Sequence, residues 1–578
     1  MKPNKRLCLA ALLLSSSSSL AQIAEFDAVT DEMLQNPPTG EWLSWRGRQN
    51  SWGYSPLDQI NTDNVKQLQL VWSWAIDDTG SGQAAPLVHN GVMFIPVPGG
   101  VVQALDAANG DLIWEYRPGI TPSIDGTDRA ISREESGDAG VLRGVQRNIA
   151  IYGEMIYSAT ENASIVAIDA RTGLLHWETQ TADPALGFRY TAGPIIANGT
   201  LVTGITGCER YKDDLCFITG HDPLSGQELW RFDTVAAPGT PGGDTWGDLP
   251  LEFRAGADSW IAGSYDPETN LVYYGTAQAK PWASAVRGTD GDALYTNSTL
   301  ALNPDTGELA WYYQHLPAET HDMDEVFEAV LVDVDGRDSI FKMGKLAILW
   351  QLDRTTGELI KATDMGYQTI VNVNPTSGNI TYRDGMIPRI GQQIDMCPST
   401  SGFKSWRAMA YSPQTSAMYI PITLNCELAT FGPTERVIGG GGVGPVRRIN
   451  YPHPLSEGNL GELLVLDIPS GDVKWRYRQR APINTAAMTT AGGLVFVGDW
   501  NRYLYAFDAE TGDKLWQTRV NTSAHGFPIS YMIDGRQFVA LPVGVGGASW
   551  STLLPRDLAP ELARPNHGNS IHVFALPQ

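Results

Sequence analysis

The sequence is poor in cysteine, in basic residues and in long apolar runs. Only 5 cysteines occur in 578 residues, and 41 lysines and arginines stand against 64 aspartates and glutamates, a net charge of −23. A phosphate polymer requires a basic protein face, so nucleic acid is not an expected partner. An acidic surface instead favours a cationic protein partner.

After the N-terminus, no apolar run approaches the roughly 20 residues of a membrane-spanning helix, so no membrane span is expected in the mature chain. The N-terminus itself has the order of a secretory signal, with basic residues over 2–6, an apolar run over 7–14 and small residues up to Ala21. We therefore expect a signal peptide over 1–21, and a mature periplasmic chain over 22–578 that forms a single domain.

Loss of the signal would leave four cysteines, Cys208, Cys216, Cys397 and Cys426. An even number in an exported protein predicts disulfides. Three pairings are possible, and proximity in the sequence favours Cys208 with Cys216 and Cys397 with Cys426. A thiolate metal site is the weaker alternative, because the sequence has no Cys-x-x-Cys spacing. Covalent haem is not expected, because Cys-x-x-Cys-His is absent as well.

Glycine and tryptophan are abundant, with 60 and 18 residues, and they recur together in a repeated segment. Its first clear copy runs from Ala104 to Trp114. Further copies lie at 167–177, 220–230, 301–311, 465–475 and 506–516, with a degenerate copy at 351–361. Each copy reads as a strand, a turn with a glycine that supplies positive φ, and a strand that closes on tryptophan, so each predicts a β-hairpin. The tryptophan ring is expected to pack against a neighbouring unit.

The closing positions are 41 to 114 residues apart, which fits a unit of about 40 to 50 residues lengthened by insertions. The 114-residue interval has room for two units. Strands expected at 68–72 and 571–575 can pair and close a ring without open edges. The sequence therefore predicts an all-β fold, an eight-bladed β-propeller with tryptophan-docking repeats, with a solenoid as the competing architecture. A repeat of this kind indicates fold and says little about function.

The acidic stretch over 319–325 is the strongest candidate for chemistry. Asp322 and Asp324 stand at i and i+2, so in extended backbone they face the same side and can share one hard cation. Alternatively, one carboxylate stays free as a base. An acidic pair in a loop is otherwise most often a solvated surface.

The repeats, the segment 265–276 and the segment 489–496, together with Gly544 to Gly547, resemble the pyrroloquinoline quinone (PQQ) dependent alcohol dehydrogenases, or quinoproteins. The resemblance extends from about Trp42 to the end of the chain. The sorbose/sorbosone dehydrogenase branch is most similar, on the strength of 208–222 and of the ending 573–578. The family resemblance implies an eight-bladed propeller that holds PQQ, with Ca²⁺ or a lanthanide ion, in its central funnel.

The resemblance also assigns roles within the acidic stretch. Asp322 is similar in position to the family's general base, although His321 stands where tryptophan is usual, either to tune or relay the proton or as a tolerated substitution. Glu209 and Asp322 are implied as metal ligands, and Asp324 matches the extra carboxylate of members that use a lanthanide.

Two departures from the family pattern are visible. The Gly-Asp-Asn motif expected for a further metal ligand reads Gly-Asp-Ala over 291–293; Asn297 is the candidate replacement, and an amide paired within its own strand is the alternative. Where many members place vicinal cysteines against the quinone, this chain has Val-Leu-Arg over 141–143. We expect another element, such as the loop between Cys208 and Cys216, to cover that face.

Around the quinone, the resemblance implies Trp260 as the stacked indole, Arg147 as the partner of a cofactor carboxylate and Thr191 as a hydroxyl donor. Lys345 matches the basic residue near the quinone oxygens, and Trp406 is expected to line the pocket. Without the resemblance, these residues would be read as core packing or solvated charges. The glycine run over 439–444 is expected to form a loop near the funnel.

The predicted activity is oxidation of primary or secondary alcohols, polyols or sugars to aldehydes or ketones, by hydride transfer to metal-bound PQQ with Asp322 as base. Three carboxylates around one ion carry a charge of about −3, which favours a trivalent ion, with calcium as the alternative. A soluble cytochrome c is the expected electron acceptor. A dehydrogenase of simple alcohols is one competing hypothesis, and a non-catalytic exported propeller that binds protein segments is another.

Overall fold

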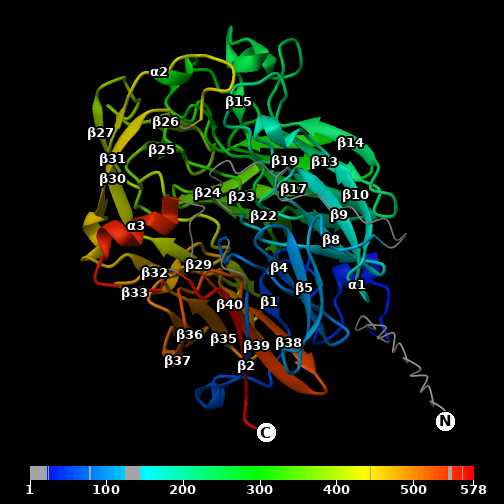
Figure 1. Ribbon diagram of the computed structural model, residues 1–578. Coiled ribbons are helices and arrows are strands. Elements are labelled where there is room, and N and C mark those ends of the chain that lie inside the picture. Colours follow the sequence, from blue (N-terminus) through cyan, green and yellow to red (C-terminus); the bar gives the residue numbers. More distant parts are fainter. Residues whose placement is uncertain are drawn as a thin grey trace, which may run out of the picture.

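The computed structural model describes residue 23 and residues 25–76, 80–123, 144–442, 444–544, 550–562, 564–565 and 567–578. Within these ranges, eight sheets of four or five strands follow one another along the chain (Figure 1). The predicted signal peptide, the Val-Leu-Arg segment over 141–143 and the glycines after Gly544 lie outside the described residues.

Four consecutive sheets form the first half of the ring. They contain β3 (Leu87–His89), β4 (Val92–Val97), β5 (Val101–Asp106) and β6 (Leu112–Tyr116); β7 (Ala150–Tyr152), β8 (Met155–Ala159), β9 (Ser164–Asp169) and β10 (Leu175–Gln180); β11 (Ile195–Ala197), β12 (Thr200–Gly204), β13 (Phe217–His221) and β14 (Glu228–Asp233); and β16 (Ser264–Asp266), β17 (Leu271–Gly275), β19 (Ser298–Leu302) and β20 (Leu309–Gln314). The next three sheets contain β21 (Val330–Val334), β22 (Arg337–Met343), β23 (Ile348–Asp353) and β24 (Leu359–Asp364); β28 (Ala410–Ser412), β29 (Ala417–Thr423), β32 (Gly461–Asp467) and β33 (Val473–Gln479); and β1 (Tyr54–Ser55), β34 (Met488–Thr490), β35 (Leu494–Gly498), β36 (Tyr503–Asp508) and β37 (Lys514–Arg519). The last sheet contains β2 (Gln69–Ala75), β38 (Ile529–Ile533), β39 (Arg536–Val543) and β40 (Ser570–Ala575).

The smaller elements connect or cover these sheets. They are β15 (Ala255–Gly256) with β18 (Ala279–Lys280), β25 (Val371–Val373) with β26 (Ile380–Tyr382), β27 (Gln393–Met396) with β30 (Asn425–Phe431) and β31 (Val446–Pro452), the helices α1 (Asp31–Gln35), α2 (Ser284–Arg287) and α3 (Trp550–Leu558), and 3₁₀ turns at Val65–Gln67, Pro184–Leu186, Gly243–Trp246, Leu251–Phe253 and Pro454–Ser456.

The two ends of the described chain meet in one sheet. Strand β2 pairs antiparallel with β40, so that Gln69 lies opposite Ala575 and Trp74 opposite Ile571. This pairing confirms the expectation that strands from the two ends share a sheet, in which β40 is an inner strand and β2 is an edge strand.

Five repeat tryptophans, Trp114, Trp177, Trp230, Trp311 and Trp475, each pack on the turn of the following sheet. A Cβ added to Gly173 would lie 2.8 Å from the ring of Trp114, and the indole Nε1 of Trp114 donates a hydrogen bond to the carbonyl of Ala170 at 2.9 Å. The same two contacts join Trp230 to the turn at 304–307 and Trp311 to the turn at 354–357. The predicted packing of tryptophan between units is therefore confirmed, and it depends on glycine because a side chain in the turn would overlap the ring.

The 114-residue interval holds one sheet of the ring rather than the two for which it has room. The other strands of this interval form the two-stranded sheet β25–β26 and the three-stranded sheet β27–β30–β31. Neither sheet shares a strand with the sheets of the ring, and we call the two together the inserted layer.

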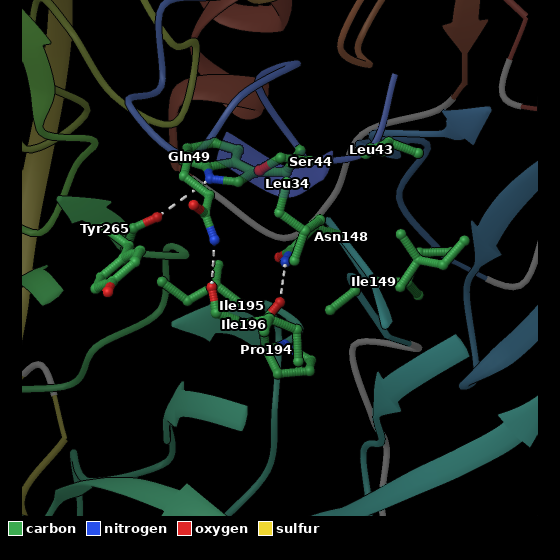
Figure 2. A pocket seen from close by; sticks show the side chains of 14 residues that line it. Leu34, Leu43, Ser44, Gln49, Asn148, Ile149, Pro194, Ile195, Ile196 and Tyr265 are labelled. Atoms are coloured by element: carbon green, nitrogen blue, oxygen red, sulfur yellow. Dashed lines mark hydrogen bonds between the residues drawn. The ribbon is translucent and has the colours of Figure 1, made fainter. Parts of the chain in front are cut away.

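The N-terminal segment around 45–49 lies across the centre of the ring. The indole of Trp45 donates to the carbonyl of Gly263 at 3.2 Å, Arg46 donates to the carbonyl of Ala487 at 2.6 Å, and the Gln49 amide donates to the carbonyl of Ile196 at 2.8 Å. Figure 2 shows the Gln49 contact beside a cavity of about 20 Å³, room for one water molecule at most. Because its partners belong to different sheets, this segment fills the centre of the ring.

Candidate active site

Three residues predicted to hold the cofactor lie just before the first strands of consecutive sheets. Arg147 precedes β7, Thr191 precedes β11 and Trp260 precedes β16. The Arg147 guanidinium donates to the carbonyls of Thr191 at 3.1 Å and Trp260 at 3.3 Å, and its carbon lies 4.9 Å from the Trp260 ring centre. The structure therefore brings these three residues together.

The Arg147 side chain is a buried cation, 4% exposed, and burial lowers its pKa to about 9. No carboxylate among the described residues forms an ion pair with it, and the buried Thr191 hydroxyl likewise has no hydrogen-bond partner there. A buried guanidinium without a counterion is costly, and a planar anionic ligand over Trp260 would supply the missing charge. The residues present thus fit PQQ, a flat quinone with carboxylate groups.

Asp322 and Asp324 are buried, 3% and 5% exposed, and both contact Lys345. The Lys345 ammonium lies 3.3 Å from Asp322 Oδ2 and 2.8 Å from Asp324 Oδ2, and it donates to the Asp322 carbonyl at 2.7 Å. Asp322 has φ of +69°, a left-handed conformation that residues other than glycine rarely adopt. Strain of this kind is retained where the surroundings hold a residue in place, as at many active sites.

The electrostatics of this pair follow from burial and from two lysines. Burial raises the pKa of Asp322 to about 7, while Lys345 and Lys280 act in the opposite direction. Burial lowers the pKa of Lys345, but the two aspartates outweigh it and leave the pKa above its ordinary value. The ammonium of Lys345 is therefore a firm counterion for the two carboxylates.

The structure adds two residues to this site that sequence reasoning missed, Gln278 and Lys280. The Gln278 side-chain amide donates to Asp322 Oδ1, and its backbone N–H donates to Asp324 Oδ1 at 3.3 Å. The Lys280 ammonium lies 3.9 Å from Asp322 Oδ1. A signal was available, because β16 and β17 form an antiparallel hairpin, so residues just after β17 return to the end of the sheet where Trp260 lies.

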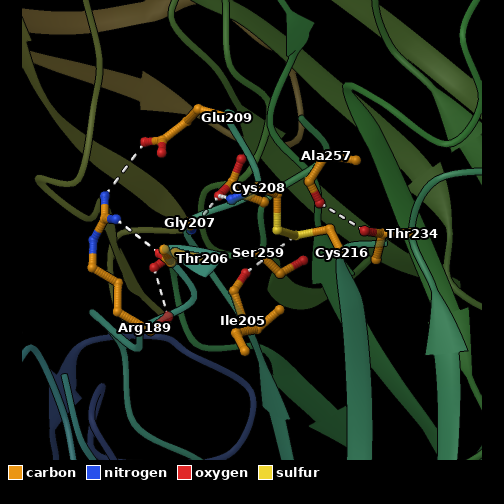
Figure 3. Close-up of a disulfide and its surroundings, with 12 residues drawn as sticks. Arg189, Ile205, Thr206, Gly207, Cys208, Glu209, Cys216, Thr234, Ala257 and Ser259 are labelled. Carbon is orange, nitrogen blue, oxygen red and sulfur yellow. Dashed lines mark hydrogen bonds and ion pairs between the residues drawn. A yellow bond between two sulfur atoms is a disulfide. The ribbon is translucent and has the colours of Figure 1, made fainter. Parts of the chain in front are cut away.

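Glu209 lies next to the disulfide between Cys208 and Cys216, shown in Figure 3. Its side chain is 35% exposed and lies 3.4 Å from Arg189. Burial raises the pKa of Glu209, but the charges of Arg189, Lys280 and Lys212 outweigh it and leave the pKa lowered. Both disulfides favoured by proximity are present, since Cys397 is bonded to Cys426.

A network of backbone contacts joins Glu209 to the rest of the site. Asp258 accepts hydrogen bonds from the backbone N–H of Gly207 at 2.8 Å and of Cys208 at 3.0 Å, and its own carbonyl accepts from Ala277 at 2.9 Å. Asp258 thus links the strand before Glu209 to the segment that carries Gln278.

The three predicted carboxylate ligands do not converge on a common point. In the described parts of the chain, Glu209, Asp322 and Asp324 are not a set whose oxygens all lie within 4.8 Å of one another. Even so, Glu209, Asp322, Asp324 and the Gln278 amide supply the oxygen donors that hard cations prefer, and the Gln278 Oε1 atom is buried without a partner among the described residues. The donor set fits a hard cation.

Asn297, the predicted amide ligand, is joined to the site through Ala277, which directly precedes Gln278. Its backbone N–H donates to the carbonyl of Ala277 at 3.0 Å. Its side-chain amide is buried, and neither amide atom has a hydrogen-bond partner in the described chain. The amide that contacts a site carboxylate is that of Gln278.

Trp406 and His321 both pack against other aromatic rings. Trp406 stacks on His525, with ring centres 5.7 Å apart. The His321 ring lies 5.7 Å from that of Tyr382, its Nε2 contacts the carbonyl of Met386, and burial lowers its pKa to about 4. His321 therefore anchors the acidic stretch to the inserted segment.

Arg407, beside Trp406, is a further buried cation that sequence reasoning missed. Its guanidinium is 0% exposed, and burial lowers its pKa to about 10. Two of its nitrogens have no hydrogen-bond partner in the part of the chain that is described. Its position directly after Trp406 was the only hint in the sequence.

The glycine run lies against the segment that carries Glu209. The backbone N–H of Gly442 donates to the carbonyl of Glu209 at 2.6 Å, and that of Gly439 donates to the carbonyl of Tyr211 at 2.8 Å. This loop connects β30 to β31, so the inserted layer reaches the edge of the site.

The comparisons with known proteins agree with this site. Residues 42–365 and 458–539 match the family described as PQQ: glucose/ethanol/alcohol dehydrogenase, beta-propeller domain. The quinoprotein alcohol dehydrogenase PedH of Pseudomonas putida KT2440 is 31% identical, with 99% of this chain and 98% of that protein covered. The 1-butanol dehydrogenase (cytochrome c) of Thauera butanivorans is 31% identical over 88% of this chain and 75% of that protein.

Among solved structures, a europium-containing methanol dehydrogenase superposes with a TM-score of 0.85 at 26% identity, covering 95% of this chain and 100% of that one. In the described residues, no helix has both the length and the apolar character to cross a membrane. The chain therefore belongs to the PQQ-dependent quinoprotein alcohol dehydrogenases, β-propeller enzymes that oxidise alcohols with PQQ and a bound Ca²⁺ or lanthanide ion.

Proposed function

We propose that this enzyme acts in the periplasm and that Asp322 is its general base. The observation that carries the proposal is the geometry of Asp322, a buried carboxylate held at positive φ and contacted by Lys345, Lys280 and Gln278. Such contacts fix the carboxylate in one orientation, so it can accept the proton of a substrate hydroxyl without reorganising.

The remaining residues would bind and orient the cofactors. Arg147 would pair with a carboxylate of PQQ, the Thr191 hydroxyl would donate to it, and the Trp260 ring would support one face. Bound PQQ would accept the hydride, and the bound cation would polarise the quinone carbonyl. Lys345 would keep a positive charge beside the quinone oxygens, and Trp406 would form a more distant wall.

For the metal, we propose Glu209, Asp322 and Asp324 as carboxylate ligands and an amide as the further ligand. Gln278 is the stronger amide candidate because it already contacts Asp322 and Asp324; Asn297 stays a second candidate. Asp322 would then serve both as ligand and as base.

For the substrate, we propose polyols, sugars or other bulky alcohols. The inserted layer places polar groups beside the site: Glu427 is 0% exposed, and Thr400 donates to it at 3.3 Å and accepts from Arg448 at 2.7 Å. The Arg448 guanidinium lies 5.7 Å from the ring centre of Trp282, and the Lys280 ammonium lies 5.2 Å from the same ring centre. A wall of this kind favours a substrate with several hydroxyl groups.

The proposed electron acceptor is a soluble cationic cytochrome c. The chain carries a net charge of −23, which would attract a basic partner. The cytochrome c in the name of the Thauera relative supports the same choice.

Reconstitution tests these proposals. Apo-protein is supplied with PQQ and either calcium or a light lanthanide, and dye reduction is measured across a panel of simple alcohols, polyols and sugars. An Asp322→Asn variant that still binds PQQ and metal should lose kcat by about 10²- to 10⁴-fold. An unimpaired variant would remove Asp322 as base, and a preference for ethanol over every polyol would overturn the substrate proposal.

A further inference from the structure

Lys280 lies between two groups of proposed metal ligands, Glu209 on one side and the pair Asp322 and Asp324 on the other. Strand β18, which ends at Lys280, pairs with β15, so that Lys280 is opposite Ala255 and Ala279 is opposite Gly256. The backbone N–H of Gly256 in turn donates to the carbonyl of Cys208 at 2.8 Å, directly before Glu209. The Lys280 backbone is therefore fixed to the Glu209 side.

The Lys280 side chain reaches the aspartates. Its ammonium lies 3.9 Å from Asp322 Oδ1 and 5.2 Å above the Trp282 ring centre, and the side chain is 8% exposed. The charge of Lys280 also acts on Glu209 and Asp258, so carboxylates lie on both sides of it.

This ammonium changes the charge that a metal ion meets. The carboxylates of Glu209, Asp322 and Asp324 contribute −3. Lys345, the counterion of the two aspartates, contributes +1, and Lys280 contributes a further +1, which leaves −1. The repulsion between a bound ion and a nearby ammonium grows with the charge of the ion, so a trivalent ion is repelled more strongly than a divalent ion at the same position.

We propose that Lys280 determines the metal specificity of this enzyme by acting as a fixed positive charge in the site, which shifts the preference from a trivalent lanthanide ion toward divalent calcium. The inference rests on the metal ligands proposed above. It does not require the site to reject lanthanides, only to favour them less than the three carboxylates would alone.

The alternative is a lysine that holds the carboxylates apart when no metal is bound and swings into solvent when one binds. Moving it would cost the same for either ion, so both affinities would fall together and their ratio would stay constant. The ratio of the two affinities, not either affinity by itself, separates the two roles.

The test uses the full chain with PQQ, stripped of metal by a chelator. Affinities for Ca²⁺ and La³⁺ are measured by thermal shift in chelator-buffered titrations, and Tb³⁺ binding is followed by luminescence sensitised by tryptophan. The variants are Lys280→Met, which removes the charge, Lys280→Gln as a second neutral variant in case the first does not fold, and Lys280→Arg, which keeps the charge. Lys361→Met is the control, since Lys361 lies on β24 and its ammonium contacts Ser470.

In the neutral variants the ratio of La³⁺ to Ca²⁺ affinity should rise about tenfold or more, from the interaction of one unit charge across several ångströms. Lys280→Arg and Lys361→Met should leave the ratio near that of the wild type. An unchanged ratio in the neutral variants would overturn the role of Lys280 alone. If neither ion bound the wild type or any variant, the proposed ligand set itself would be wrong.

Discussion

The packing of tryptophan on glycine predicts a specific stability difference between two turns of one sheet. Gly336 lies in the turn between β21 and β22, and Gly357 in the turn between β23 and β24; their φ angles are +73° and +74°. A Cβ on Gly336 would have no atom within 4 Å, whereas a Cβ on Gly357 would lie 2.4 Å from the Trp311 ring. The two glycines therefore differ in packing and hardly at all in backbone conformation.

Replacing each glycine by alanine separates the two costs. Gly336→Ala should lower the free energy of unfolding by about 1–2 kcal/mol, the strain of a side chain at positive φ. Gly357→Ala should lose the same amount plus about 1–3 kcal/mol for overpacking. The displaced indole would also weaken its hydrogen bond to the Arg354 carbonyl, now 3.2 Å long, at a further cost of about 1 kcal/mol.

The assay is denaturant unfolding of both variants, followed by tryptophan fluorescence. Both alanine variants are also measured in a Trp311→Ala background, as a double-mutant cycle. Without the indole ring, Gly357→Ala should lower the free energy of unfolding no more than Gly336→Ala does. Equal losses for the two alanine variants in the wild-type background would refute the reasoning, since the glycines would then be needed only for their backbone conformation.

Three further predictions concern the cofactor, pH and the substrate. Replacing Arg147 by Met should weaken PQQ binding by about tenfold or more, because a charge-assisted hydrogen bond is lost, and Arg147→Lys should weaken it less; equilibrium dialysis of PQQ measures both. Burial lowers the pKa of His89, but its contacts with carboxylate and carbonyl oxygens, including Glu41 at 2.6 Å from Nδ1, outweigh burial and leave the pKa raised. The stabilisation that protonated His89 contributes is therefore fully present below about pH 6.5 and is lost as pH rises through the folded-state pKa. The difference in unfolding free energy between the wild type and His89→Gln should therefore narrow as pH rises, and a gap that widens would contradict this assignment. Replacing Glu427 by Gln should raise KM for polyols while leaving KM for ethanol unchanged, and an equal rise for both would place Glu427 outside substrate recognition.

The sequence by itself determined the ring of sheets, because each repeat carries its own strand periodicity, turn glycine and closing tryptophan. Those signals are local, and the packing of Trp114 on Gly173 repeats at each junction that has the same residues. Family resemblance singled out Arg147 and Trp260 as cofactor residues, and the structure places each just before the first strand of its sheet. The disulfide pairs were readable because their partners are close in the sequence.

Tertiary structure alone decided what surrounds Asp322. Gln278 and Lys280 are more than forty residues away in the chain and reach the carboxylate only because a hairpin returns to the end of the sheet where Trp260 lies. The position of the inserted layer likewise depends on which strands pair, and no local sequence pattern predicts that pairing. Charge at the proposed metal site is a sum over side chains that are distant in the sequence, so counting the carboxylates of one stretch omits the lysines that the fold places beside them.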